Sequence, residues 1–64
     1  MRTIELIDKP SLMRELADRR YGKGSALPSR VTWWRWCKAI GVSSSASTFT
    51  TDEKDRFIEH LNSL

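Results

Sequence analysis

The 64-residue sequence predicts one mainly α-helical domain, built from three short helices with at most a minimal β hairpin. Apolar residues recur at helical spacing in three segments, and each segment follows residues that commonly begin a helix. Stretches that contain glycine or several serines separate the three segments. A chain of this length has room for a single small core, so residues 1–64 are expected to form one domain.

The N-terminal part of the chain predicts a short strand followed by the first helix. Residues 3–7 alternate weakly between apolar and polar side chains, as an edge strand does. In residues 8–11, proline suits a first helical turn and the aspartate or serine can cap it. The helix is expected to run to about Tyr21. Its apolar face holds Leu12, Met13, Leu16 and Ala17, and its solvent side holds the pairs Arg14–Asp18 and Glu15–Arg19.

The middle of the sequence predicts a loop and a second helix. Residues 21–29 contain two glycines and end near Pro28, which is typical of a loop. Ser29 can cap a helix over residues 30–40, and Gly41 is well placed to end it in the left-handed conformation.

The C-terminal part predicts the third helix. Residues 42–47 are small and polar, include three consecutive serines, and show no helical period, whereas residues 47–49 could be extended. Thr50 and Glu53 have the spacing of a capping box. The apolar face of this helix holds Phe57, Ile58, Leu61 and Leu64. The expected core of the whole domain is Leu12, Met13, Leu16, Trp33, Trp36, Ile40, Phe57, Ile58 and Leu61.

The second helix carries the most informative pattern, because residues 32–38 hold all three tryptophans and two cations. At 100° per residue, the face assigned to the core holds Trp33, Trp36, Cys37 and Ile40. The other face holds Arg30, Trp34 and Lys38 as a stripe, with Val31 and Arg35 beside them. Trp34 either packs under the loop of residues 21–29 or is exposed as an anchor. A helix with this division has the form of a DNA recognition helix.

Charge is unevenly distributed along the sequence. Residues 10–41 carry seven cations and two acids, a net charge of +5, whereas residues 42–64 carry a net charge of −2. We expect Arg19, Arg20 and Lys23 to lie beside the second helix and to extend its positive surface. A patch of about five cations would release several counterions from DNA. The alternative is that these residues only form solvated helix faces, with Arg20 snorkelling at the end of the first helix.

Several local strings resemble the DNA-binding domains of the MerR and phage excisionase superfamily. Residues 32–36, Thr-Trp-Trp-Arg-Trp, match the family's recognition-helix string of threonine, an apolar residue, a pair that often includes arginine, and tyrosine or tryptophan. Residues 47–53 match the aromatic and hydroxyl residues that end the family's wing and the acidic residues that start the next helix, although the arginine before the aromatic is missing. The loop of residues 21–29 is longer than the family's usual turn. Residues 42–49, which correspond to the family's wing, are short and carry no cation, whereas the family's wing commonly contacts phosphate.

This resemblance implies a helix-turn-helix or winged-helix fold and binding to double-stranded DNA. The protein would be a transcription regulator or a recombination and excision accessory factor, with residues 30–40 as recognition helix. The DNA-facing residues would be Arg19, Arg20, Lys23, Arg30, Val31, Trp34, Arg35 and Lys38. A domain this small would need a second copy, or a neighbouring DNA-bound protein, to reach useful specificity. Contacts that the cation-free wing does not provide would move to the helices.

Two other functions remain open at this stage. Trp34 and its apolar neighbours could dock into a partner protein, with the cations only steering association. The tryptophan-rich helix could also mediate self-association.

Other chemistry finds little support in the sequence. His60 has no nucleophile near it in sequence, and we find neither paired carboxylates nor a glycine-rich phosphate loop, so no enzymatic activity and no cofactor are expected. One histidine and one cysteine cannot build a zinc site, and the lone Cys37 allows no internal disulfide. No apolar run approaches the roughly 20 residues of a membrane span. We therefore expect a cytoplasmic protein without membrane contact.

Overall fold

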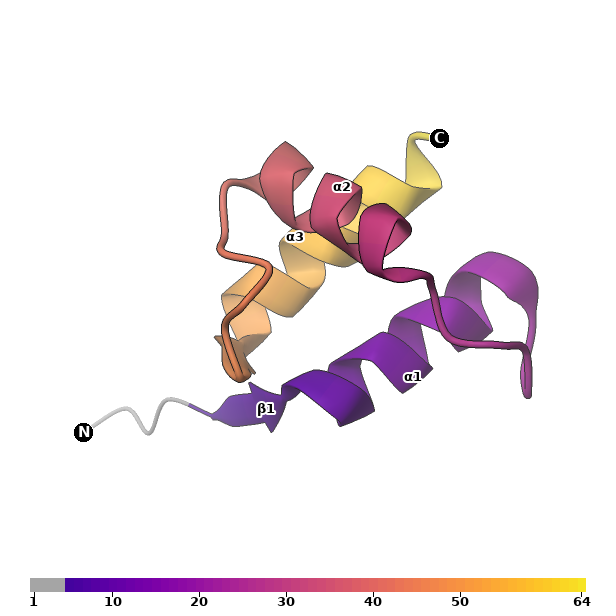
Figure 1. Cartoon of the computed structure of the whole chain (residues 1–64), viewed down its shortest axis with the longest axis horizontal. Coiled ribbons are helices and arrows are strands. Elements are labelled where there is room, and N and C mark those ends of the chain that lie inside the picture. Colours follow the sequence, from indigo (N-terminus) through magenta and orange to yellow (C-terminus); the bar gives the residue numbers. More distant parts are fainter. Residues whose placement is uncertain (1–4) are drawn as a thin grey trace.

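The computed structural model describes residues 5–64, and the three helices and two-stranded sheet found there confirm the predicted mainly α fold (Figure 1). Strand β1 (Leu6–Asp8) leads directly into helix α1 (Lys9–Tyr21). Helix α2 (Arg30–Ile40) follows the loop, and strand β2 (Thr48–Thr50) leads into helix α3 (Thr51–Asn62).

The two strands form an antiparallel pair that joins the beginning of the chain to the start of α3. Ile7 lies opposite Phe49, with Leu6 opposite Thr50 and Asp8 opposite Thr48. The strand expected over residues 3–7 therefore runs to Asp8, and its first two residues lie outside the described part of the chain. The described part of this strand is thus Leu6–Asp8, which lies later in the chain than expected. Asp8 is both the last paired residue of the strand and the N-cap of α1.

Local hydrogen bonds define the starts of the three helices and the end of α2 where the sequence predicted them. The Asp8 carboxylate accepts from the Ser11 amide, and Ser29 Oγ accepts from the Thr32 amide. Thr50 and Glu53 form the full capping box. Gly41 ends α2 with φ of 81°, a left-handed conformation that glycine adopts without strain. Helix α3 ends at Asn62, so Leu64, which was expected on its apolar face, lies beyond the helix and is 64% exposed.

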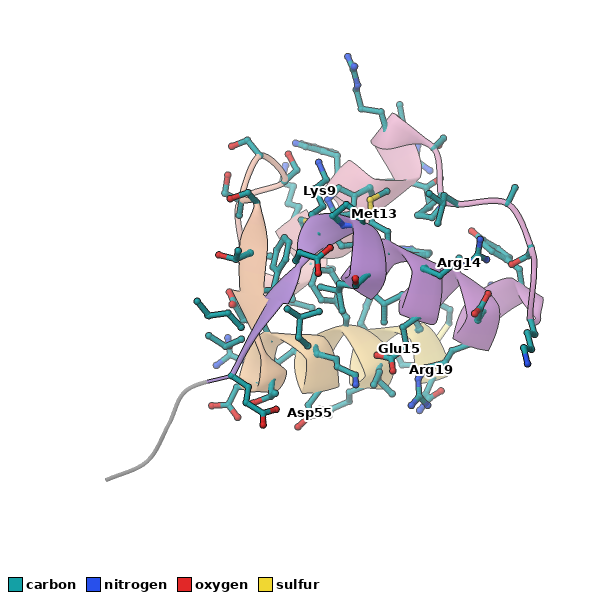
Figure 2. The ribbon with its side chains drawn as sticks, turned by 90° about the horizontal axis from the view of Figure 1, so that it is seen from below. Lys9, Met13, Arg14, Glu15, Arg19 and Asp55 are labelled. Atoms are coloured by element: carbon teal, nitrogen blue, oxygen red, sulfur yellow. The ribbon has the colours of Figure 1, made fainter. Side chains whose placement is uncertain are left out.

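Helix α3 is central to the packing because it contacts both α1 and α2. Figure 2 shows α1 and α3 side by side, with the strands at one end. Glu15 on α1 pairs with Lys54 on α3 at 2.8 Å. The expected Glu15–Arg19 pair is thus replaced by a bridge between helices, whereas the Arg14–Asp18 pair forms at 2.6 Å.

The core is an aromatic cluster around Trp33. Its indole stacks on Phe57 with ring centroids 5.1 Å apart, and Phe49 meets it edge-on at 5.7 Å. The buried residues of the core are Leu12, Leu16, Ala17, Trp33, Trp36, Cys37, Phe49, Phe57 and Leu61. Phe49 is the core residue that the sequence analysis assigned to the wing, and it is 1% exposed. Met13, Ile40 and Ile58, expected inside, are partly buried against the edge of this cluster.

The loop between α1 and α2 is held against the end of α1. Arg14 donates to the Ser25 carbonyl, and the Asp18 carboxylate accepts from the Gly24 amide at 3.2 Å. The hydrogen bond from Arg14 keeps the pKa of Asp18 below its ordinary value. This anchoring fixes where α2 begins relative to α1.

Candidate nucleic-acid interface

Helix α2 has one buried face and one exposed face, as its sequence predicted. Trp33, Trp36 and Cys37 are buried, and burial raises the pKa of the Cys37 thiol to about 11. The thiol is therefore neutral near pH 7. The exposed side chains of the opposite face, which we name the α2 outer face, are Arg30, Val31, Trp34, Arg35 and Lys38.

Trp34 is the exposed aromatic residue of the α2 outer face, with 48% of its surface accessible. Lys38 Nζ lies 4.7 Å from the centroid of the indole, within the range of a cation–π contact. Trp34 lines a groove with Lys9, Ser44 and Ser45 rather than packing under the loop of residues 21–29. The arrangement orients a flat apolar ring beside a cation at the surface.

The cations of the α2 outer face have no carboxylate partner among residues 5–64. Helix α2 contains no acidic residue, and the ion pairs in the described part of the chain join Arg14 to Asp18 and Lys54 to Glu15. The positive end of the helix dipole lies at the same end as Arg30. This surface consequently presents positive charge that no acidic side chain neutralises.

Arg20 and Arg35 lie together at the other border of the α2 outer face. Both line a recess with Tyr21, Trp36 and His60. Arg20 is exposed, and its guanidinium carbon lies 5.9 Å from the centroid of the Tyr21 ring. The structure therefore brings Arg20 next to α2, as the sequence analysis expected.

Arg19 does not join this group, which corrects the expected cluster. It lines a different recess, formed with Arg20 and with Ile58, Leu61 and Asn62 of α3, and Figure 2 shows it on the side of α1 that faces α3. Because successive helix positions turn by about 100°, Arg20 lines both this recess and the one beside α2, whereas Arg19 is turned towards α3. Lys23 is exposed in the loop, where its charge contributes to lowering the pKa of Asp18.

Lys9 is a cation near the α2 outer face that sequence analysis missed. Its Nζ donates to the Ser44 carbonyl at 3.3 Å, and it lines the same groove as Arg30 and Trp34. Nothing in the local sequence places it there. The pairing of β1 with β2 brings the start of α1 to the connection that follows α2.

Residues 42–49, which were expected to form a wing, do not form a hairpin within this segment. Of residues 42–49, only the last two belong to a strand, and that strand pairs with β1. The serines in this connection bond to each other instead, with Ser43 Oγ and Ser45 Oγ 2.8 Å apart.

Other kinds of site are not formed by the described residues. In residues 5–64, no three His, Cys, Asp or Glu side chains come together in a way that could hold a metal ion. Within the same range, no helix combines the length and apolar character needed to cross a membrane. His60 is half-buried beside Arg35 and Leu64 at the edge of a recess.

Comparisons with family models, with curated proteins and with solved structures find no match to the chain. The likeness to MerR and excisionase domains therefore rests on the short strings of residues 32–36 and 47–53.

Proposed function

We propose that the protein binds double-stranded DNA, with α2 as the recognition helix in the major groove. The observation that carries this proposal is the α2 outer face, in which three cations without acidic partners among residues 5–64 share one helix face with an exposed indole, and one of them, Lys38, contacts that indole. Arg35, at the border of this face beside Arg20, is assigned a base contact or a key phosphate contact. Such a protein would act in the cytoplasm as a transcription regulator or as an accessory factor for recombination.

The roles of the remaining residues follow from their positions. Arg30 and Lys38 extend the surface along α2, and Arg20 adds a cation at its border. Val31 is 58% exposed and offers apolar contact of the kind that thymine methyl groups accept. Arg19 lines a recess with residues of α3, and Lys23 lies in the loop before α2, so they are assigned at most to flanking phosphates.

The experiment is a fluorescence-anisotropy titration of a labelled random duplex at low and moderate salt. If about four cations contact phosphates, log K should fall with log salt at a slope of roughly −3 to −4. Arg35→Ala should weaken binding by about tenfold or more and reduce this slope by about one.

Arg56→Ala provides the matched control, because it removes the same charge from an exposed position on α3. It should change the affinity by less than about twofold if binding is confined to the α2 outer face. Equal losses in the two variants, or no binding at low salt, would remove the proposal.

A second candidate function is docking to a partner protein. It is favoured by the exposure of Trp34 and Val31, since aromatic anchors of this kind dominate many interfaces. Docking should tolerate salt and depend on Trp34, whereas DNA binding should depend on salt and on Arg35.

The oligomeric state bears on the same proposal. A single copy of so small a domain reads few base pairs, so a second copy or a neighbouring DNA-bound protein is expected to complete the site. Light scattering on the free protein and on its mixture with duplex DNA measures this directly.

A further inference from the structure

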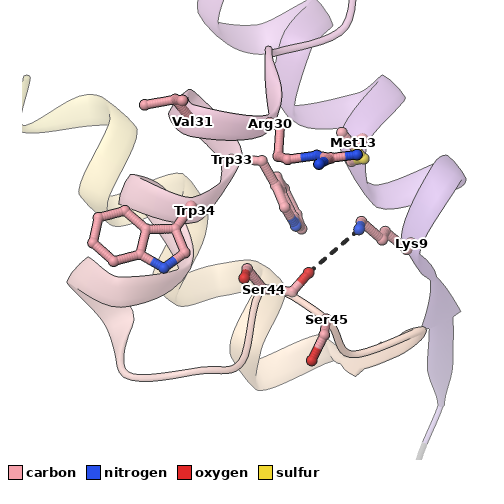
Figure 3. A pocket seen from close by; sticks show the side chains of 8 residues that line it. All are labelled: Lys9, Met13, Arg30, Val31, Trp33, Trp34, Ser44 and Ser45. Atoms are coloured by element: carbon pink, nitrogen blue, oxygen red, sulfur yellow. Dashed lines mark hydrogen bonds between the residues drawn. The ribbon is translucent and has the colours of Figure 1, made fainter.

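A groove lies between the start of α1, the start of α2 and the serine connection (Figure 3), with a volume of about 630 Å³. Volumes of this size hold small organic molecules. Met13, Val31 and the indole of Trp34 supply apolar walls, and no acidic side chain lines the groove. The interior therefore suits an apolar body and disfavours a cation.

Two cations border the same groove. Lys9 and Arg30 come from different helices, and neither forms an ion pair among residues 5–64. The hydrogen bond of Lys9 to the Ser44 carbonyl is 3.3 Å long, which is beyond the usual range for an N–H donor. Both side chains consequently have donors to offer to an anion.

The indole nitrogen of Trp33 is a buried donor. Trp33 is 2% exposed, and its Nε1 has no hydrogen-bond acceptor among residues 5–64. Figure 3 shows this nitrogen at the end of the ring that is turned towards Lys9 and Ser44. Because an indole N–H can only donate, an oxygen acceptor in the groove would satisfy it.

From these three features we infer that the groove binds a small aromatic carboxylate. The ring would lie against Trp34 and Val31, and the carboxylate would accept hydrogen bonds from Trp33 Nε1, Lys9 and Arg30. Lys9 leaves its long bond to Ser44 when the carboxylate enters. This site shares Arg30, Val31 and Trp34 with the proposed DNA-binding surface. Lys9, Met13 and Trp33 belong to the groove alone.

The test is a titration of the ¹⁵N-labelled full chain with 2-naphthoate, followed through the three indole N–H signals. The Trp33 signal should move downfield and saturate, with a dissociation constant on the order of 0.1–1 mM for a ligand of this size. Two related compounds separate the contributions: 2-naphthylmethanol lacks the charge, and acetate lacks the rings. Each should bind at least about tenfold more weakly.

Charge variants locate the site. Lys9→Gln and Arg30→Gln should each weaken 2-naphthoate binding by roughly three- to tenfold. Arg56→Gln removes the same charge from an exposed position on α3 outside the groove and should leave the affinity unchanged. The amide spectrum of each variant shows whether it is folded.

Three results would overturn the assignment: a Trp33 signal that does not respond, equal binding of the neutral alcohol, or an equal loss in Arg56→Gln. These titrations contain no DNA, so their outcome tests the groove separately from the proposed DNA binding.

Discussion

Helix α2 carries tryptophan on both of its faces, and the two faces meet different surroundings. Trp36 is 4% exposed and packs 6.3 Å from Trp33 and 6.4 Å from Tyr21, measured between ring centroids. Trp34, two positions earlier, is 48% exposed and contacts Lys38. The same residue type thus contributes to folding in one position and remains available for binding in the other. Packing of the core therefore does not explain why the α2 outer face carries an aromatic residue and three cations.

The largest expected difference between the faces is in stability. Trp36→Ala should lower the free energy of unfolding by about 3–5 kcal/mol, because it removes a buried aromatic side chain and leaves a cavity. A domain of this length has a total stability of roughly 3–10 kcal/mol, so much of the variant should be unfolded. Urea denaturation followed by circular dichroism measures the change.

Trp36→Phe keeps most of the buried ring and provides a variant that should remain folded. It should fall between wild type and Trp36→Ala. A loss below about 1 kcal/mol for the alanine variant would contradict the assignment of this face to the core.

The sequence was sufficient to predict those features that depend on neighbouring residues. Asp8, Ser29 and Thr50 act as caps because their partners lie three residues away. The division of α2 into two faces followed from helical geometry alone. These features need no knowledge of how distant segments meet.

Features that depend on distant segments could not be predicted in the same way. Phe49 is buried because β2 pairs with β1 and turns this side chain into the core, and only the alternation of residues 48–50 hinted at it. Glu15 bonds to Lys54 across the α1–α3 contact instead of to Arg19. Lys9 reaches the groove through the same strand pairing.

The cap of α2 should contribute less than its buried face. Ser29 Oγ accepts from the Thr32 amide at 3.2 Å and lies 3.0 Å from Thr32 Oγ1. Ser29→Ala should therefore cost about 1 kcal/mol, as measured by urea denaturation. Ser47→Ala, at another exposed serine, should change stability by less than about 0.5 kcal/mol. Equal effects would show that the cap does not hold α2.

The smallest stability effect is expected on the α2 outer face. Trp34→Ala removes an exposed ring and one cation–π contact, so it should cost less than about 1 kcal/mol by the same urea measurement. A loss above about 2 kcal/mol would make Trp34 a packing residue and weaken the contrast with Trp36.

The most direct measurement for the proposed function is a two-dimensional ¹H–¹⁵N spectrum of the labelled protein titrated with a short DNA duplex at low salt. The account predicts that the largest shifts occur at Arg30, Val31, Trp34, Arg35 and Lys38, including the Trp34 indole, and that added salt reverses them. Shifts concentrated on the exposed residues of α3, or no shifts at all, would contradict it.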